Sequence, residues 1–166
     1  MIFDLSEIFS GDQDFIDIDY ELDLSDILLS EQKIFDNPIH IVGRIQNHAG
    51  IVTCDYTADI FMSAICDRCL DRFDISRKQK FSSTLLTDAN DEENTEHYIC
   101  ENSLLDFDDM ARTDILLSIP SKLLCSENCN GLCDQCGAKL DEDGGCSCSS
   151  NQIDPRLEKL KQLLEN

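Results

Sequence analysis

Apolar and acidic residues alternate near the start of the chain. The segment from Phe15 to Leu24 reads FIDIDYELDL, in which every second position from Ile16 onward is apolar and the positions between are acidic. A period of two places the apolar side chains on one face of a strand. We therefore expect a half-buried strand within an acidic N-terminal segment, residues 1–37.

Residues 38–87 predict an antiparallel meander of three strands. Regularly spaced isoleucines lead into a short turn at residues 47–50, which ends in Gly. Residues 51–65 are rich in Ile, Val, Thr and Phe, the residue types that favour strands. Residues 66–70 would form the second turn, and residues 73–86 the third strand.

A helix is predicted after a polar, acidic loop at residues 88–103. Within the segment 104–120, Asp106 can cap the N-terminus of the helix and Pro120 ends it. One helix face would carry Phe107, Met110, Ala111 and Leu117, flanked by Ile115 and Leu116. Such a helix can cover the open face of the meander. The predicted fold class is therefore α+β, with an acidic body over residues 1–120.

Residues 121–166 predict a separate cysteine-rich module followed by a short helix over residues 154–166. Asp154 can act as the N-cap and Pro155 suits the first helical position. An apolar stripe then follows at Leu157, Leu160 and Leu164.

The net charge of −21 changes the functional picture. Acidic residues number 34 against 13 basic ones. Because affinity for nucleic acid comes largely from Lys and Arg, such a chain is repelled by a bare phosphate backbone. Basic proteins, including ribosomal proteins, are its natural complement. Solubility alone is the other interpretation of this charge.

The chain has no apolar run long enough to cross a membrane, and its first residues lack the basic and apolar regions of a secretory signal. We therefore expect a cytoplasmic protein. The ten cysteines then indicate metal binding, because cytosolic thiols stay reduced.

The strongest metal motif is Cys133-Asp134-Gln135-Cys136-Gly137. Two intervening residues let a tight turn direct both sulfurs at one ion, and a zinc ion requires four ligands. Cys146 and Cys148 offer the second pair, and this set of four is the first choice. Cys125 and Cys129 offer another pair, and the main rival set has Cys125 or Cys129 in place of one of Cys146 and Cys148.

A second CxxC motif lies in the predicted strand turn, at Cys66 and Cys69. Together with Cys125 and Cys129 it could form a second site. The alternative is that Cys66 and Cys69 are ordinary semi-buried thiols. Cys54 and Cys100 stand alone and are expected in the core.

Catalytic motifs are absent from the sequence. The three histidines are scattered, and there is neither an HExxH motif nor a phosphate-binding glycine loop. A zinc ion closed by four cysteines is structural, since catalysis requires an open coordination position. We therefore expect no enzyme activity and no small-molecule substrate.

Basic residues concentrate in one stretch, which contains Arg68, Arg72, Arg77, Lys78 and Lys80. They could contact RNA or a partner protein. The alternative is that they pair with the acidic groups of the protein itself.

Three segments in this order resemble the YceD-type family of large ribosomal RNA subunit accumulation proteins. They are Cys66-Asp67-Arg68-Cys69-Leu70, the cysteine run from Leu123 to Cys148, and Ile153-Asp154-Pro155-Arg156-Leu157 with Leu160. The resemblance extends over residues 38–166. The family often has Pro at position 134 and Asn at positions 139 and 141, differences that leave the spacing of the sulfurs unchanged.

The resemblance implies a cytoplasmic bacterial protein, with plastid relatives, that supports accumulation of 23S ribosomal RNA. Members are commonly encoded beside ribosomal protein L32, which is a candidate partner. Many relatives lack the cysteines, which implies that metal is a structural option of the fold. The competing hypothesis is a zinc-handling or thiol redox-responsive protein.

Overall fold

The computed structural model describes residues 1–29, 31–87, 97–140, 145, 146 and 148. The chain forms two compact units. The body unit comprises Met1–Ala64 and Arg72–Leu123, and the cysteine unit comprises Ile65–Asp71 and Leu124–Asn166. The predicted helix over residues 154–166 lies outside the described residues, as does the part of the predicted acidic loop at residues 88–96.

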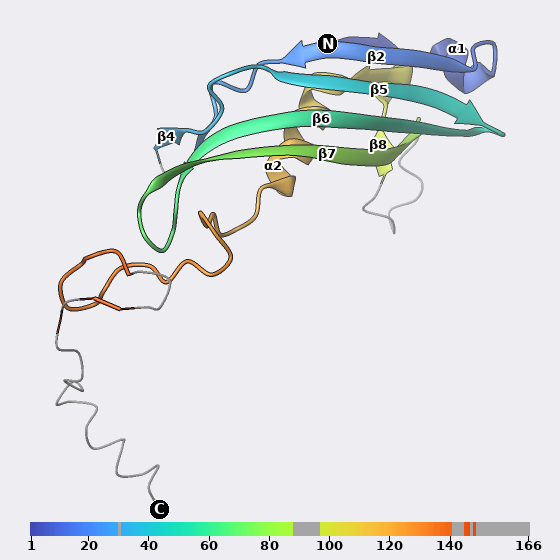
Figure 1. The fold of residues 1–166 in the computed structure, drawn as a ribbon. Helices are drawn as coiled ribbons and strands as arrows, with labels where there is room; N and C mark the ends of the chain where they lie inside the picture. Colours follow the sequence, from blue (N-terminus) through green and yellow to red (C-terminus); the bar gives the residue numbers. More distant parts are fainter. Residues whose placement is uncertain (30, 88–96, 141–144, 147, 149–166) are drawn as a thin grey trace, which may run out of the picture. The chain divides into compact units, whose positions relative to one another are not determined.

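A five-stranded sheet dominates the body unit (Figure 1), with its strands in the order β2-β5-β6-β7-β8. The strands are β2 (Phe15–Leu22), β5 (Ile39–His48), β6 (Ile51–Ile65), β7 (Arg72–Leu86) and β8 (His97–Ile99). β5 pairs antiparallel with both β2 and β6, whereas β8 joins β7 in parallel. The predicted three-strand meander and the predicted half-buried strand in the alternating segment 15–24 are confirmed.

The hairpin between β5 and β6 turns at Ala49 and Gly50, as expected from the sequence. Their φ angles are 53° and 90°, so both lie in the left-handed region. Two such residues make the hairpin turn whose twist matches that of the flanking strands. The turn therefore fixes the register that pairs His48 with Ile51.

Several short elements were not predicted. They are β1 (Ile2–Asp4), α1 (Ser6–Ser10), β3 (Leu28–Leu29), β4 (Gln32–Lys33), β9 (Leu104–Asp106) and a 3₁₀ turn at Glu101–Ser103. β1 pairs with β9, and β3 with β4. The prediction of a loop over residues 88–103 was wrong for residues 97–99, which form β8. Elements of two to five residues are too short to show a hydrophobic period.

Helix α2 (Phe107–Ser118) is the predicted cover of the sheet. Its N-cap is Asp106, whose side chain accepts a hydrogen bond from the backbone N–H of Asp109 at 3.3 Å. Ile119 forms the C-cap, directly before Pro120. The predicted cap and helix end are confirmed.

The predicted apolar face of α2 needs one correction, because Leu117 is 80% exposed. The buried stripe instead advances in steps of four residues, through Phe107, Ala111 and Ile115. Each such step rotates by about 40° around the helix, because one turn takes about 3.6 residues. Leu117 is two positions beyond Ile115, about 200° around the helix, and therefore points away from the core.

The core lies between α2 and one face of the sheet. Even-numbered side chains of β6, among them Tyr56, are buried, and the odd-numbered ones are more exposed. The ring of Phe107 makes edge contacts with Phe3, Tyr20 and Tyr56 at centroid separations of 5.1–5.9 Å. Gly43 allows β5 to approach Tyr56, because a Cβ at Gly43 would lie 2.3 Å from that of Tyr56. The α+β fold class is therefore confirmed.

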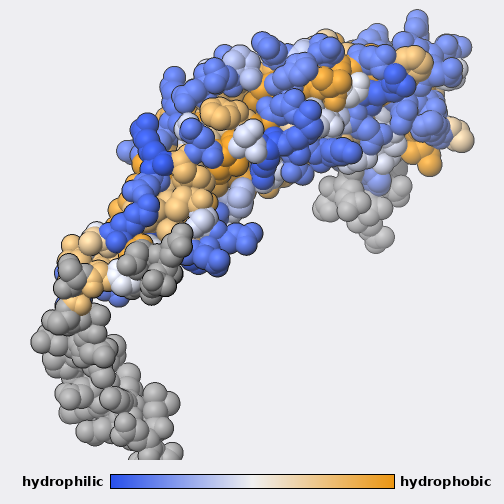
Figure 2. Space-filling model, viewed as in Figure 1, coloured by the Kyte–Doolittle hydropathy of each residue, from blue (hydrophilic) through white to orange (hydrophobic). Residues whose placement is uncertain are grey.

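The surface reflects the acidic composition. In Figure 2, hydrophilic residues cover most of the visible surface of the described residues, with apolar residues gathered in smaller groups. Among the described helices, none is both long and apolar enough to cross a membrane.

Candidate metal centres

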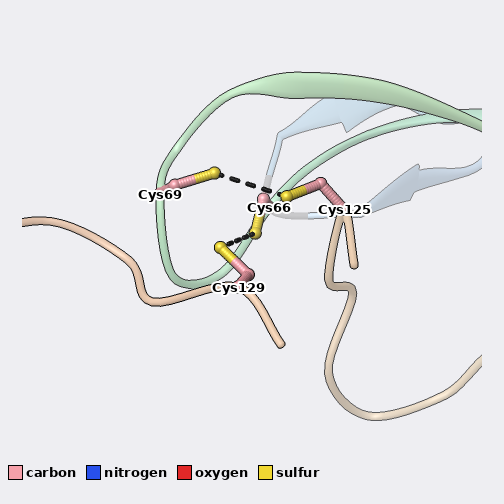
Figure 3. Close-up of side chains that lie close together, drawn as sticks. All are labelled: Cys66, Cys69, Cys125 and Cys129. Atoms are coloured by element: carbon pink, nitrogen blue, oxygen red, sulfur yellow. Dashed lines mark hydrogen bonds between the residues drawn. The ribbon is translucent and has the colours of Figure 1, made fainter. Parts of the chain in front are cut away.

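Four cysteines from two distant segments form the first group, Cys66, Cys69, Cys125 and Cys129. Their sulfur atoms all lie within 4.8 Å of one another. Figure 3 shows the side chains pointing toward one another, with 3.8 Å between the sulfurs of Cys66 and Cys129 and 3.6 Å between those of Cys69 and Cys125. A Zn–S bond of about 2.3 Å implies a sulfur–sulfur separation of about 3.8 Å in a tetrahedral site. The first group therefore fits one tetrahedral ion.

A tight turn between β6 and β7 supplies the first two of these sulfurs. The N–H of Leu70 donates to the carbonyl of Cys66 at 2.9 Å, and the N–H of Cys66 donates to the carbonyl of Asp71 at 2.9 Å. Leu70 has a φ of 61°. This left-handed residue closes the turn, so that Cys66 and Cys69 face the same point.

Arg68 joins the turn to the segment that carries Cys129. Its guanidinium donates to the carbonyl of Cys129 at 2.8 Å. Gly131 has a φ of +77°, and a Cβ there would lie 3.0 Å from the carbonyl oxygen of Arg68. The close approach of these two segments therefore favours Gly at position 131 and positions Cys129 against the turn.

The second group contains Cys133, Cys136, Cys146 and Cys148, again with all sulfurs within 4.8 Å of one another. The sulfurs of Cys133 and Cys146 are 3.3 Å apart. The backbone of the CxxC turn is closed by two 2.8 Å hydrogen bonds, from Gly137 to the carbonyl of Cys133 and from Cys133 to the carbonyl of Ala138. Gly137 has a φ of +70°, which explains the Gly after the second cysteine.

Two thiols of the first group, Cys66 and Cys69, have pKa values shifted in opposite directions. Desolvation opposes ionisation of Cys66, but N–H groups of Cys125, Cys69 and Arg68 donate to its sulfur and lower its pKa to about 6. A hydrogen bond from the Asp71 backbone lowers the pKa of Cys69, but burial and the neighbouring sulfurs outweigh it and raise that pKa to about 12. Adjacent thiolates repel one another, and a cation at their centre would remove this conflict.

In the second group, the pKa values of Cys133 and Cys148 are likewise shifted in opposite directions. Hydrogen bonds from the backbone of Cys136 and Gln135 lower the pKa of Cys133 to about 7. Contact with the sulfurs of Cys136 and Cys146 raises the pKa of Cys148 to about 12. The donor set of both groups is thiolate only, which suits zinc and other soft ions.

An ion pair inside the cysteine unit links the Cys66–Cys69 turn to the segment after Cys136. The ammonium of Lys139 contacts the carboxylate of Asp71 and lowers its pKa. Both side chains are half exposed. The pair therefore positions the turn more than it stabilises the fold.

The structure brings together both sets of four that the sequence suggested. Cys133, Cys136, Cys146 and Cys148 were the first choice, and the set of Cys66, Cys69, Cys125 and Cys129 was the weaker alternative. Cys54 and Cys100 are buried in the body unit and belong to neither group, as expected. The contribution of Arg68 to the site was missed, although its place between Cys66 and Cys69 was a usable signal.

The predicted contact residues lie in the turn before β7 and on both faces of β7. Alternation along β7 leaves Arg72, Lys78 and Lys80 exposed, whereas Arg77 is more buried and donates to the backbone and hydroxyl oxygens of Ser118. Lys78 pairs with Asp59 at 3.1 Å. Two of the five predicted contact residues, Arg77 and Lys78, are thus engaged within the body unit, and Arg68 is engaged within the cysteine unit.

Comparison with known proteins identifies the family. The family model described as "Large ribosomal RNA subunit accumulation protein YceD" matches residues 54–164. The uncharacterised protein YlbN of Bacillus subtilis (strain 168) is 30% identical over 138 residues, which cover 78% of this chain and 76% of YlbN. No solved structure matches. The matched range contains all eight cysteines of the two groups, and the chain belongs to the YceD family of large ribosomal RNA subunit accumulation proteins.

Proposed function

We propose that this protein is a non-enzymatic, cytoplasmic accessory factor in biogenesis of the large ribosomal subunit, where it supports accumulation of 23S ribosomal RNA. Family membership over residues 54–164 is the observation that carries the proposal. Two closed groups of four cysteines agree with a structural role for metal, since neither offers an open coordination position.

The direct partner is a basic ribosomal protein, for which L32 is one candidate. A net charge of −21 attracts a strongly basic surface over a range set by the ionic strength. Acidic side chains lie beside several of the basic ones that a phosphate backbone would contact, as Asp59 does beside Lys78. A shallow hollow of about 440 Å³ across β5, β6 and β7 has both Arg44 and Lys80 in its lining, but also the acidic Asp55. Precursor ribosomal RNA is therefore the less favoured partner.

Zinc is the ion that both cysteine groups fit best. All eight ligands are sulfurs, and the spacing of the first group agrees with that of a zinc–tetrathiolate site. The ions would stabilise the cysteine unit, because binding to thiolates that converge only in the folded unit adds to its folding free energy.

The second candidate function is zinc handling. Exposure of Cys136 favours it, because an accessible thiolate can pass its metal to another ligand. The two functions can be distinguished by association with ribosomal particles, which a zinc-handling protein does not require.

The test is sedimentation of a native lysate that contains the tagged protein, on sucrose gradients at low and raised salt. We expect the protein to migrate with large-subunit precursors and to be released by salt. Recovery only at the top of the gradient at both salt concentrations would leave an unassembled ribosomal protein or zinc handling as the better account.

A charge variant separates protein from RNA contact. Replacement of Arg72, Lys78 and Lys80 by Gln should leave sedimentation unchanged if a basic protein is the partner, since the acidic surface is retained. Loss of co-sedimentation in this variant would instead assign the contact to RNA.

A further inference from the structure

We infer that the cysteine unit holds two zinc ions of unequal exchangeability, a retained ion in the first group and an exchangeable ion in the second. The inference rests on the zinc content that is part of the proposed function. It adds the number of ions and the separate behaviour of the second site.

The two groups are separate sites. Each contains four sulfurs that lie within 4.8 Å of one another, and no cysteine is shared between them. Four thiolates complete the tetrahedral coordination of one zinc ion. Eight sulfurs in two such sets therefore hold two ions, rather than one ion with four spare thiols.

Burial differs between the groups. In the first group, Cys66, Cys69 and Cys129 are 0%, 3% and 8% exposed, and Cys125 alone is partly exposed. In the second group only Cys133 is buried, whereas Cys136 is exposed and Cys146 and Cys148 are partly exposed. An incoming ligand must approach the metal to form an intermediate of higher coordination, which zinc can adopt. Access of this kind exists at the second group and is restricted at the first.

Described contacts also tie the two segments of the first group together. Arg68 fixes the two segments of the first group to each other through its hydrogen bond to Cys129, and Gly131 lies against the Arg68 backbone. In the second group, the described backbone hydrogen bonds close the turn from Cys133 to Ala138. The N–H of Cys148 also donates a hydrogen bond to the sulfur of Cys146. A rigid ligand set retains its ion, since every ligand must leave a fixed position to release it.

The first experiment is native mass spectrometry of the full-length, zinc-loaded protein, followed by transfer of zinc to an excess of the chromogenic chelator 4-(2-pyridylazo)resorcinol. We expect two zinc ions per chain and two transfer phases of equal amplitude, with rates that differ by at least about tenfold. One ion per chain, or a single phase that releases both ions, would overturn the inference.

Variants assign the phases. Cys136→Ser should remove the fast phase and leave the rate of the slow phase unchanged, and Cys69→Ser should remove the slow phase. Cys54→Ala removes a thiol outside both groups and should keep both ions. Loss of the slow phase in Cys136→Ser, with the fast phase retained, would reverse the assignment and contradict the inference.

Misfolding of the Cys69→Ser variant does not weaken the test, because ¹¹³Cd substitution gives a second readout on the unaltered protein. Two cadmium resonances in the range of sulfur-only coordination are expected, and Cys136→Ser should shift one of them alone. A single resonance would contradict two separate sites. Absence of ribosomal co-sedimentation would leave this result untouched, so the proposed function and the inference fail independently.

Discussion

Single residues decide where the sheet can pack closely. Gly43 is the clearest case, because its backbone lies against Tyr56 and Asp55 on the neighbouring strand. On the same strand, the Tyr56 hydroxyl donates to Asp114 of α2 at 2.6 Å. The first contact holds β5 against β6, and the second joins β6 to the helix that covers the sheet.

Gly43→Ala should destabilise the body unit by about 3 kcal/mol, at the upper end of overpacking effects, because the added Cβ would clash with backbone atoms that cannot move independently. Urea unfolding monitored by circular dichroism measures this loss. Gly50→Asn is the matched control. A Cβ added at position 50 would meet no heavy atom within 4 Å, and Asn tolerates a left-handed conformation. The loss of stability in this variant should therefore stay below about 1 kcal/mol. Equal losses in the two variants would contradict this account.

The raised pKa of the Asp114 carboxyl should make the free energy of unfolding depend on pH. Burial raises its pKa above 3.8, although the hydrogen bond from Tyr56 acts in the opposite direction. The folded state therefore holds this proton more tightly than the unfolded state. The contribution of Asp114 to the free energy of unfolding therefore falls as the pH rises from about 3.8 to the raised pKa. Above the raised pKa this contribution no longer changes with pH.

Asp114→Asn should remove this pH-dependent loss while keeping an oxygen for Tyr56. The variant should gain stability relative to the wild type as the pH rises, and the gain should level off above the raised pKa. Denaturation at several pH values measures the difference. A gain that grows as the pH falls would have the wrong sign and exclude a raised pKa.

At the scale of elements, the contribution of the Asp106 N-cap to the stability of α2 can be tested directly. Asp106→Ala removes the side chain that accepts from the N–H of Asp109 and should cost about 1 kcal/mol, the usual value for an N-cap. Thr113→Ala, at an exposed position within the same helix, should change stability by less than about 0.5 kcal/mol. Thermal unfolding of both variants provides the comparison.

Long elements were predictable from the sequence and short ones were not. β6 shows fifteen residues of alternating burial, so its period is visible in the sequence. β1 and β9 have three residues each, and they form because they pair with each other across about a hundred residues of chain. Leu117 was misplaced because the buried stripe of α2 rotates along the helix, which a fixed helical face does not represent.

The metal groups show a similar limit. The local spacing of Cys133 and Cys136 predicts a turn that directs both sulfurs at one ion, whichever cysteines complete the set. The choice of Cys125 and Cys129 as partners of Cys66 depends on where the fold places the β6–β7 turn, which no local motif contains. Only the proximity of the sulfurs in the folded chain distinguishes the two sets.

At the scale of the whole molecule, the division into two units predicts separable unfolding. Removal of zinc with a strong chelator should unfold the cysteine unit and leave the sheet intact, because the five-stranded sheet has its own core. Amide hydrogen exchange should then rise in residues 124–140 and stay low in β5 and β6. A cooperative loss of protection throughout the chain would contradict two units.

The proposed zinc sites also predict a dependence on pH at this scale. Thiolates bind metal only when deprotonated, so acid should release zinc from both groups. Zinc content measured by native mass spectrometry should decline as the pH falls below 7. Zinc retained in full at pH 4 would exclude coordination by thiolates alone.

The discontinuity of the cysteine unit has a consequence for synthesis of the chain. Cys69 leaves the ribosome 56 residues before Cys125. At roughly 5–20 residues per second, this interval is about 3–11 s. During that time the first CxxC pair has been translated and its two partners have not, while β7, β8 and α2 are made. The first zinc site could therefore be completed only late in translation. A zinc ion bound at this site would indicate a chain whose body unit has been fully translated.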